Sequence, residues 1–174
     1  GCLWSKRSSN LTAQSITVDL KREFAPRLQP FKKISPGKPK VAVCLHLYYT
    51  EQWTKISQRI KLISEPFDLF VTCVPEHLNL VAGDVHKLFP QATIVAAENG
   101  GMDVLPFFAI NHDYALWSYS AVLKLHTKNT KTDDDAIFGN LCYESLLPSP
   151  EVIKNVVSSL EHDPEVGMIG PEAL

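Results

Sequence analysis

The sequence predicts an α/β fold in which a mostly parallel sheet lies between helices on both faces, in three α/β/α layers. Short apolar runs rich in strand-forming residues alternate with segments whose apolar residues recur every three or four positions. The length of 174 residues and the hydrophobic content of 45% suit one core of ordinary size. In such a fold, ligands gather at the carboxyl ends of the parallel strands.

The predicted sheet begins after a linker at 35–40, which is rich in Pro and Lys. The apolar run 41–47 is expected to be a strand buried on both faces. Apolar residues at three- and four-residue steps then predict a helix over 53–63. The run 67–74 is the second expected strand, and 76–89 is the second expected helix, ending before a proline.

The middle of the chain repeats this alternation. Residues 92–97 are expected to form a third strand, which leads into the glycine-containing loop 98–103. A helix is expected through 107–110, followed by a fourth strand at 120–126. A strand that runs through a polar loop into a helix is the unit from which parallel α/β sheets are built.

After the fourth strand we expect a polar loop containing Asp133, Asp134 and Asp135, then a helix over 150–161 and a short strand at 166–169. Two regions follow from this pattern. Residues 1–40 are expected to form a basic arm and linker, and residues 41–174 an α/β domain that is expected to be a fragment of a longer protein.

Charge is distributed unevenly along the chain. The net charge is −2, yet the expected arm at 1–40 is rich in Lys and Arg. Such an arm could contact an anionic surface such as the inner face of a membrane, or it could be a solvated tail. Because aromatic residues do not alternate with the basic ones, nucleic acid is not an expected partner.

Cysteine usage and hydropathy indicate the compartment. None of the four cysteines has CxxC spacing, and Cys44 and Cys73 fall within apolar runs, so buried free thiols are expected. No apolar run approaches the roughly 20 residues that span a bilayer. We therefore expect a cytoplasmic location, including the inner face of the plasma membrane.

The loop 98–103 carries the first group of candidate site residues. Glu98, Asn99, Gly101 and Asp103 lie where a strand delivers the chain to the start of a helix, so backbone N–H groups could approach a ligand closely. Asp103 could contact this ligand, or it could cap the helix.

The fourth expected strand carries the second group. Alternation places Lys124, His126 and Lys128 on one side of this strand, near its carboxyl end. Two lysines and an imidazole suit a phosphate or diphosphate. The alternative is a buried lysine paired with a carboxylate, either Asp68 or Asp103.

Two further groups are weaker candidates. His46 and Tyr48 follow the first strand and could hold a base or a sugar, or His46 could be a structural residue. The acidic run at 133–135 could bind a divalent cation or be solvated. A metal is possible but not expected, and no other cofactor is indicated.

These segments together resemble the rhamnan synthesis protein F family. The resemblance rests on VAVCLHLYY, EPFDLFVT, ENGGMDVLPF, VLKLHTK and VGMIGP, which occur in the family's order over about residues 41–171. The layout also resembles the nucleotide-binding half of the GT-A glycosyltransferase fold, which is Rossmann-like. In that fold the corresponding strand ends in a metal-binding Asp-x-Asp, whereas here it ends in Lys124-Leu-His126-Thr-Lys128.

The resemblance implies a glycosyltransferase, expected to be a rhamnosyltransferase, in the synthesis of a bacterial cell-surface polysaccharide such as rhamnan or O-antigen. It further implies a nucleotide-diphosphate sugar as donor and a lipid-linked or polysaccharide acceptor. Asp103 is a candidate catalytic base, and the alternative is that the base and the acceptor site lie in the part of family members that continues beyond residue 174. The strand-end cations would then neutralise the leaving diphosphate in place of a metal. The alternative is a non-catalytic nucleotide- or glycan-binding module that partners a separate transferase.

Overall fold

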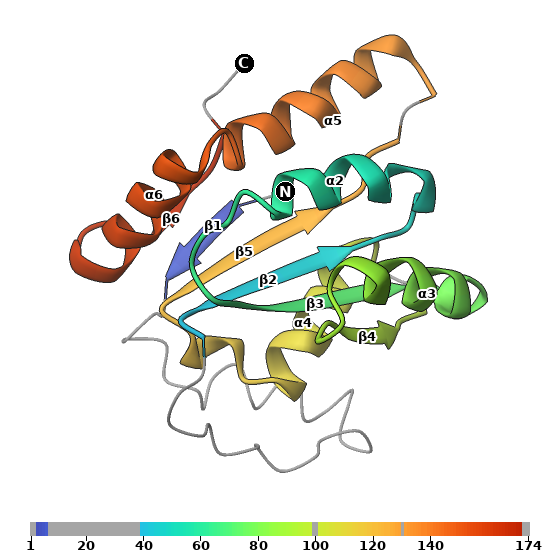
Figure 1. Ribbon diagram of the computed structural model, residues 1–174, viewed down its shortest axis with the longest axis horizontal. Coiled ribbons are helices and arrows are strands. Elements are labelled where there is room, and N and C mark those ends of the chain that lie inside the picture. Colours follow the sequence, from blue (N-terminus) through green and yellow to red (C-terminus); the bar gives the residue numbers. More distant parts are fainter. Residues whose placement is uncertain (1–2, 7–38, 99–100, 130, 172–174) are drawn as a thin grey trace.

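A computed structural model describes residues 3–6, 39–98, 101–129 and 131–171 (Figure 1). Its sheet has the strand order β4-β3-β2-β5-β1-β6. Four neighbouring strands are parallel: β4 (Thr93–Ala96), β3 (Phe67–Cys73), β2 (Val41–His46) and β5 (Ala121–His126). This arrangement confirms the mostly parallel sheet.

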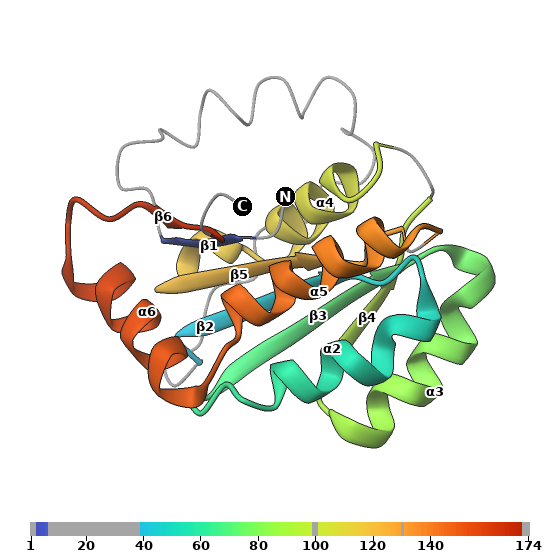
Figure 2. The ribbon, with the colours of Figure 1, turned by 90° about the horizontal axis from the view of Figure 1, so that it is seen from above.

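The helices cover both faces of the sheet (Figure 2). One face packs against α2 (Trp53–Ile60), α3 (Leu78–Leu88), α5 (Asp133–Leu146) and α6 (Pro150–His162). The other face packs against α4 (Val104–Asp113). The three-layer α/β/α prediction is therefore confirmed.

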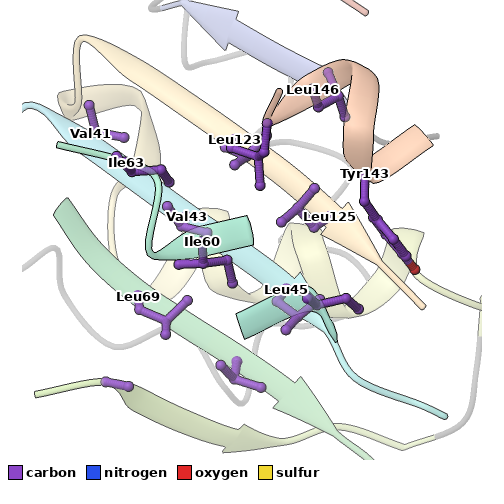
Figure 3. Close-up of a cluster of buried hydrophobic side chains, with 14 of the residues drawn as sticks. Val41, Val43, Leu45, Ile60, Ile63, Leu69, Leu123, Leu125, Tyr143 and Leu146 are labelled. Atoms are coloured by element: carbon purple, nitrogen blue, oxygen red, sulfur yellow. The ribbon is translucent and has the colours of Figure 1, made fainter. Parts of the chain in front are cut away.

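The core is divided between these two faces because side chains alternate along each strand. Val41, Val43 and Leu45 of β2 point toward α2 and α5 in the larger cluster (Figure 3). Ala42 and Cys44 of the same strand point toward α4 in the smaller one. All six residues of β2 are buried, as expected for a central strand covered on both faces.

The first strand of the sheet is a departure from the sequence prediction. Leu3–Lys6, within the segment assigned to a basic arm, form β1, which pairs antiparallel with β5 in the register Leu3↔Lys124 and Lys6↔Ala121. Its other edge pairs with β6 (Met168–Ile169), which is shorter than the expected strand at 166–169. The physical reason is that the edge of β5 offers unpaired backbone groups, which β1 satisfies.

The prediction of a polar loop at 133–135 is wrong, since α5 begins at Asp133. Acidic residues favour the amino end of a helix, where they interact with its dipole. Buried residues Cys142, Tyr143 and Leu146, at three- and four-residue spacing, hold the helix against the sheet. The acidic run therefore starts a helix that packs over the carboxyl half of β5.

Short 3₁₀ turns lie at Thr50–Gln52, Pro75–His77 and Leu116–Ser118.

Cys44, Cys73 and Cys142 are buried free thiols, as predicted. Within the described residues, none of the helices combines the length and apolar character that crossing a membrane requires.

Candidate functional site

The carboxyl ends of β2, β3 and β5 meet at one edge of the sheet. His46, the last residue of β2, is in register with Thr72 of β3 and with His126 of β5. The Nδ1 atom of His46 lies 2.9 Å from the Thr72 hydroxyl. The parallel register thus brings together two imidazoles from segments far apart in the sequence.

Asp103 and Lys124 form a buried ion pair next to these imidazoles. Their side chains are 12% and 9% exposed, and the lysine ammonium donates a hydrogen bond to the carboxylate. His126 Nδ1 lies 4.0 Å from the other carboxylate oxygen of Asp103. The strand-end cation Lys124 therefore has an internal counter-charge.

This contact decides between the alternatives for two residues. Asp103 precedes α4, but its side chain makes no capping hydrogen bond. The other candidate carboxylate, Asp68, instead accepts a 2.5 Å hydrogen bond from the Tyr119 hydroxyl. Lys124 is therefore a buried lysine paired with a carboxylate, and that carboxylate belongs to Asp103 and not to Asp68. Contact between this pair and a donor stays a prediction.

An unusual backbone turn places Asp103 over the sheet. Gly101 and Met102 have φ angles of 66° and 55°, so two consecutive residues adopt the left-handed region. A Cβ atom at Gly101 would lie 3.0 Å from that of Leu105. Glycine is required there for both reasons, whereas Met102 bears the strain of a non-glycine residue.

The electrostatics of the cluster leave it nearly neutral at pH 7. Burial, followed by the Lys128 charge, lowers the pKa of His126 to about 4. Burial also lowers the pKa of His46, an effect that Asp103 partly opposes. Burial alone would raise the pKa of Asp103, but the hydrogen bond from Lys124 and the charge of that lysine lower it. The carboxylate is therefore ionised beside two neutral imidazoles.

The floor of the site is apolar. Phe70, Pro106, Phe107 and Ile110 line it below the polar cluster, and Lys124 Nζ lies 5.7 Å from the centre of the Phe107 ring. The space left among these side chains holds roughly one water molecule. A larger ligand must therefore lie across the edge of the sheet or displace the Asp103 turn.

The segment after β5 is attached to the loop after β2. The Thr127 hydroxyl accepts hydrogen bonds from the backbone N–H groups of Tyr48 and Tyr49, each at 3.1 Å. The Tyr48 ring lies 6.5 Å from the His46 ring. Lys128 Nζ lies 5.5 Å from the centre of the Phe138 ring on α5, whereas Lys124 Nζ lies near Phe107 on α4. The expectation that both lysines lie on one side of the strand is therefore wrong, because the strand ends at His126 and alternation does not extend to Lys128. This side of the edge is therefore aromatic as well as cationic.

Most of the other candidate residues lie outside the described part of the chain. Glu98 is exposed, and Asn99 lies outside the described residues. The side chains of 133–135 are also outside the description. Among the residues that the structure describes, no group of three or more His, Cys, Asp or Glu is arranged to hold a metal ion.

Sequence reasoning missed the neutral residues that hold the site together. Thr72 and Thr127 are buried threonines at strand ends, and Gln52 binds the backbone of Lys128. Because side chains alternate along β3, Thr72 could have been expected to point to the same face of the sheet as His46. Nothing in the sequence marks Gln52.

The fold and this cluster define the chain as a parallel α/β domain with a candidate ligand site at the carboxyl ends of its strands. The chain belongs to the rhamnan synthesis protein F family, whose sequence profile matches residues 15–174. The family is named for the synthesis of rhamnan, a polysaccharide.

Two curated relatives come from Xanthomonas campestris pv. campestris, strains B100 and ATCC 33913, and both carry the description "Uncharacterized protein WxcX". They are 28% and 27% identical to the chain over 137 residues. The alignment covers 77% of the chain but 19% of each relative, so the chain spans about a fifth of their length. No solved structure matches the chain.

Proposed function

We propose that the chain is the donor-binding part of a glycosyltransferase that uses a nucleotide-diphosphate sugar to build a bacterial cell-surface polysaccharide. The observation that carries the proposal is the cluster of His46, Asp103, Lys124 and His126 at one edge of a parallel sheet. Family membership supports polysaccharide synthesis as its context.

The chemistry of this cluster suits a sugar donor. Once the Asp103 turn is displaced, its apolar floor of Phe70 and Phe107 beside a polar edge can accept one face of a sugar ring. The ionised Asp103 carboxylate can accept a hydrogen bond from a hydroxyl group, and it is the candidate base for the acceptor. Cationic side chains at the strand end would stabilise the charge that develops on the leaving diphosphate.

Two finer parts of this proposal rest on the family alone. They are a rhamnosyl donor and a lipid-linked or polysaccharide acceptor, while work at the inner face of the cytoplasmic membrane, a third finer part, rests on the basic residues of 1–40. Each concerns the whole protein, and the aligned part of the chain is 19% of the length of the relatives.

Calorimetry with UDP and dTDP, each with and without EDTA, tests donor binding. Binding of either nucleotide, weakened in a His46→Gln variant, supports the proposal. A matched control is His86→Gln on α3, whose imidazole contacts the Ala92 carbonyl away from the site. Failure of every nucleoside diphosphate to bind would refute it. Incubation with the corresponding nucleotide sugars and a glycan acceptor then tests transfer.

A second candidate is a non-catalytic nucleotide- or glycan-binding module that partners a separate transferase. The observation that favours it is the Asp103–Lys124 pair, because a carboxylate whose pKa is lowered is a weaker base. Tight binding of a nucleotide sugar without transfer or hydrolysis, even by the full-length protein, would select this candidate over an enzyme.

A further inference from the structure

Lys128 differs from Lys124 in having no described counter-charge. The ion pairs formed by described side chains include Lys124 with Asp103, but none involves Lys128. Lys128 instead places its ammonium over the ring of Phe138, which is 50% exposed. Of the two strand-end lysines, Lys128 is therefore the one without a counter-charge among the described side chains.

The Gln52 side chain forms hydrogen bonds with both backbone polar groups of Lys128, as the backbone of a neighbouring strand would. Gln52 Nε2 donates to the Lys128 carbonyl at 2.5 Å, and the Lys128 N–H donates to Gln52 Oε1 at 3.3 Å. The Tyr143 hydroxyl lies 3.3 Å from the same Gln52 oxygen and 2.8 Å from the His126 carbonyl. These contacts fix the position of Lys128 relative to the end of β5.

The stem of Lys128 lies against α5 at a residue without a side chain. A Cβ atom on Gly139 would lie 3.1 Å from Lys128 Cβ and 3.3 Å from its Cγ, closer than ordinary contacts. Gly139 is buried within the helix, where glycine is otherwise unfavourable. The glycine thus permits a close approach that directs the ammonium toward Phe138.

This arrangement borders the candidate site. His126, which lies beside Asp103, is also connected through its carbonyl to Tyr143 and so to Gln52. Lys128 follows His126 by two residues, and its charge contributes to the lowered pKa of that imidazole. A ligand across the edge of the sheet could therefore meet both.

We propose that Lys128 is the phosphate-binding cation of the site, and that Gln52, Gly139 and Phe138 are positioning residues that hold it ready for a diphosphate. This inference rests on the proposed function for the identity of the ligand. A cation held in place before binding loses little side-chain entropy, so its charge-assisted hydrogen bond is strong. Lys124, already neutralised by Asp103, would contribute less to anion binding.

The first test compares three probes by calorimetry: pyrophosphate, UDP and uridine. Lys128→Gln is expected to weaken pyrophosphate and UDP binding by about tenfold or more, and to leave any uridine binding unchanged. The matched control is Lys87→Gln, an exposed lysine on α3, for which no change is expected. The charge-neutral double variant Asp103→Asn/Lys124→Met should retain pyrophosphate binding better than Lys128→Gln does.

The second test separates positioning from folding. Gly139→Ala introduces the missing Cβ while favouring the helix, so we expect weaker pyrophosphate binding without a lower melting temperature. Gly83→Ala, within α3, is the matched control because its Cβ would meet nothing within 4 Å. It should raise helix stability equally and leave binding unchanged. Equal pyrophosphate affinity in both glycine variants would overturn the positioning role.

The outcomes distinguish this inference from the proposed function. Nucleotide binding that Lys128→Gln leaves intact overturns the inference and keeps the proposed function. Lys128-dependent binding of pyrophosphate without any nucleotide preference supports the inference but counts against a nucleotide donor. If neither pyrophosphate nor UDP binds, both proposals are wrong.

Discussion

Replacing Lys124 by methionine removes one partner of the buried ion pair while keeping a side chain of similar length. Asp103 is then left as a buried carboxylate without its cation, since the two side chains are only 12% and 9% exposed. Losing one member of such a pair typically costs about 3–5 kcal/mol. Because Asp103 lies on a turn rather than in a strand, we expect the lower end, about 3 kcal/mol. For a domain of this size that corresponds to a melting temperature lower by about 6–12 °C.

Urea denaturation followed by circular dichroism measures this cost in a double-mutant cycle. Asp103→Asn alone leaves the ammonium without a charged partner and should also destabilise. The double variant Asp103→Asn/Lys124→Met removes both charges, and it should recover about 2 kcal/mol relative to the sum of the single variants. Additivity within about 0.5 kcal/mol would refute the reasoning, because it would mean that the two residues do not interact in solution.

Three further predictions concern pH, backbone strain and metal. His126 takes up a proton in the unfolded chain near its ordinary pKa of 6.5 but in the folded protein only at about 4, so stability should fall between these two values as the pH decreases. The loss has an upper limit of about 3 kcal/mol, measurable by urea denaturation, and His126→Gln should reduce the pH dependence. Gly101→Ala should destabilise by about 1–2 kcal/mol in the same assay, because it strains a left-handed residue and crowds Leu105; an unchanged midpoint would contradict this. Binding of UDP should persist in EDTA and weaken as salt rises; loss of binding in EDTA, reproduced by Asp→Asn changes at 133–135, would instead indicate a metal site.

Much of the fold could be predicted because its signals are local. The run Val41–His46 is apolar throughout, as a central strand covered on both faces must be. Alternation correctly placed Lys124 on the face of β5 that carries the candidate site, where it lies beside residues of β2. These inferences need only the period of the strand and the parallel order of the sheet.

The parts of the fold that the sequence did not predict depend on contacts with residues far away in the sequence. Leu3–Lys6 is a four-residue segment whose strand exists because β5 and β6 offer backbone groups to it, and no local pattern records that. The acidic start of α5 has the composition of a loop, although acidic residues also suit a helix start.

The site could be predicted in outline but not in its pairing. Both Asp68 and Asp103 were possible partners for Lys124, and only three-dimensional contact assigns Asp68 to Tyr119 and Asp103 to the lysine. Gln52 could not be found because a neutral amide on a turn has no characteristic spacing.

The placement of β1 has a consequence for biosynthesis. Leu3–Lys6 are translated long before Ala121–His126 and Met168–Ile169, the strands between which β1 lies. The parallel strands β2, β3 and β4 can pair in the order in which they emerge from the ribosome, but β1 has no partner until β5 has been made. A nascent chain therefore carries β1 without its neighbours in this sheet while β2, β3 and β4 assemble. Its insertion is a late step of folding, and until then the outer edge of β5 remains open to wrong partners.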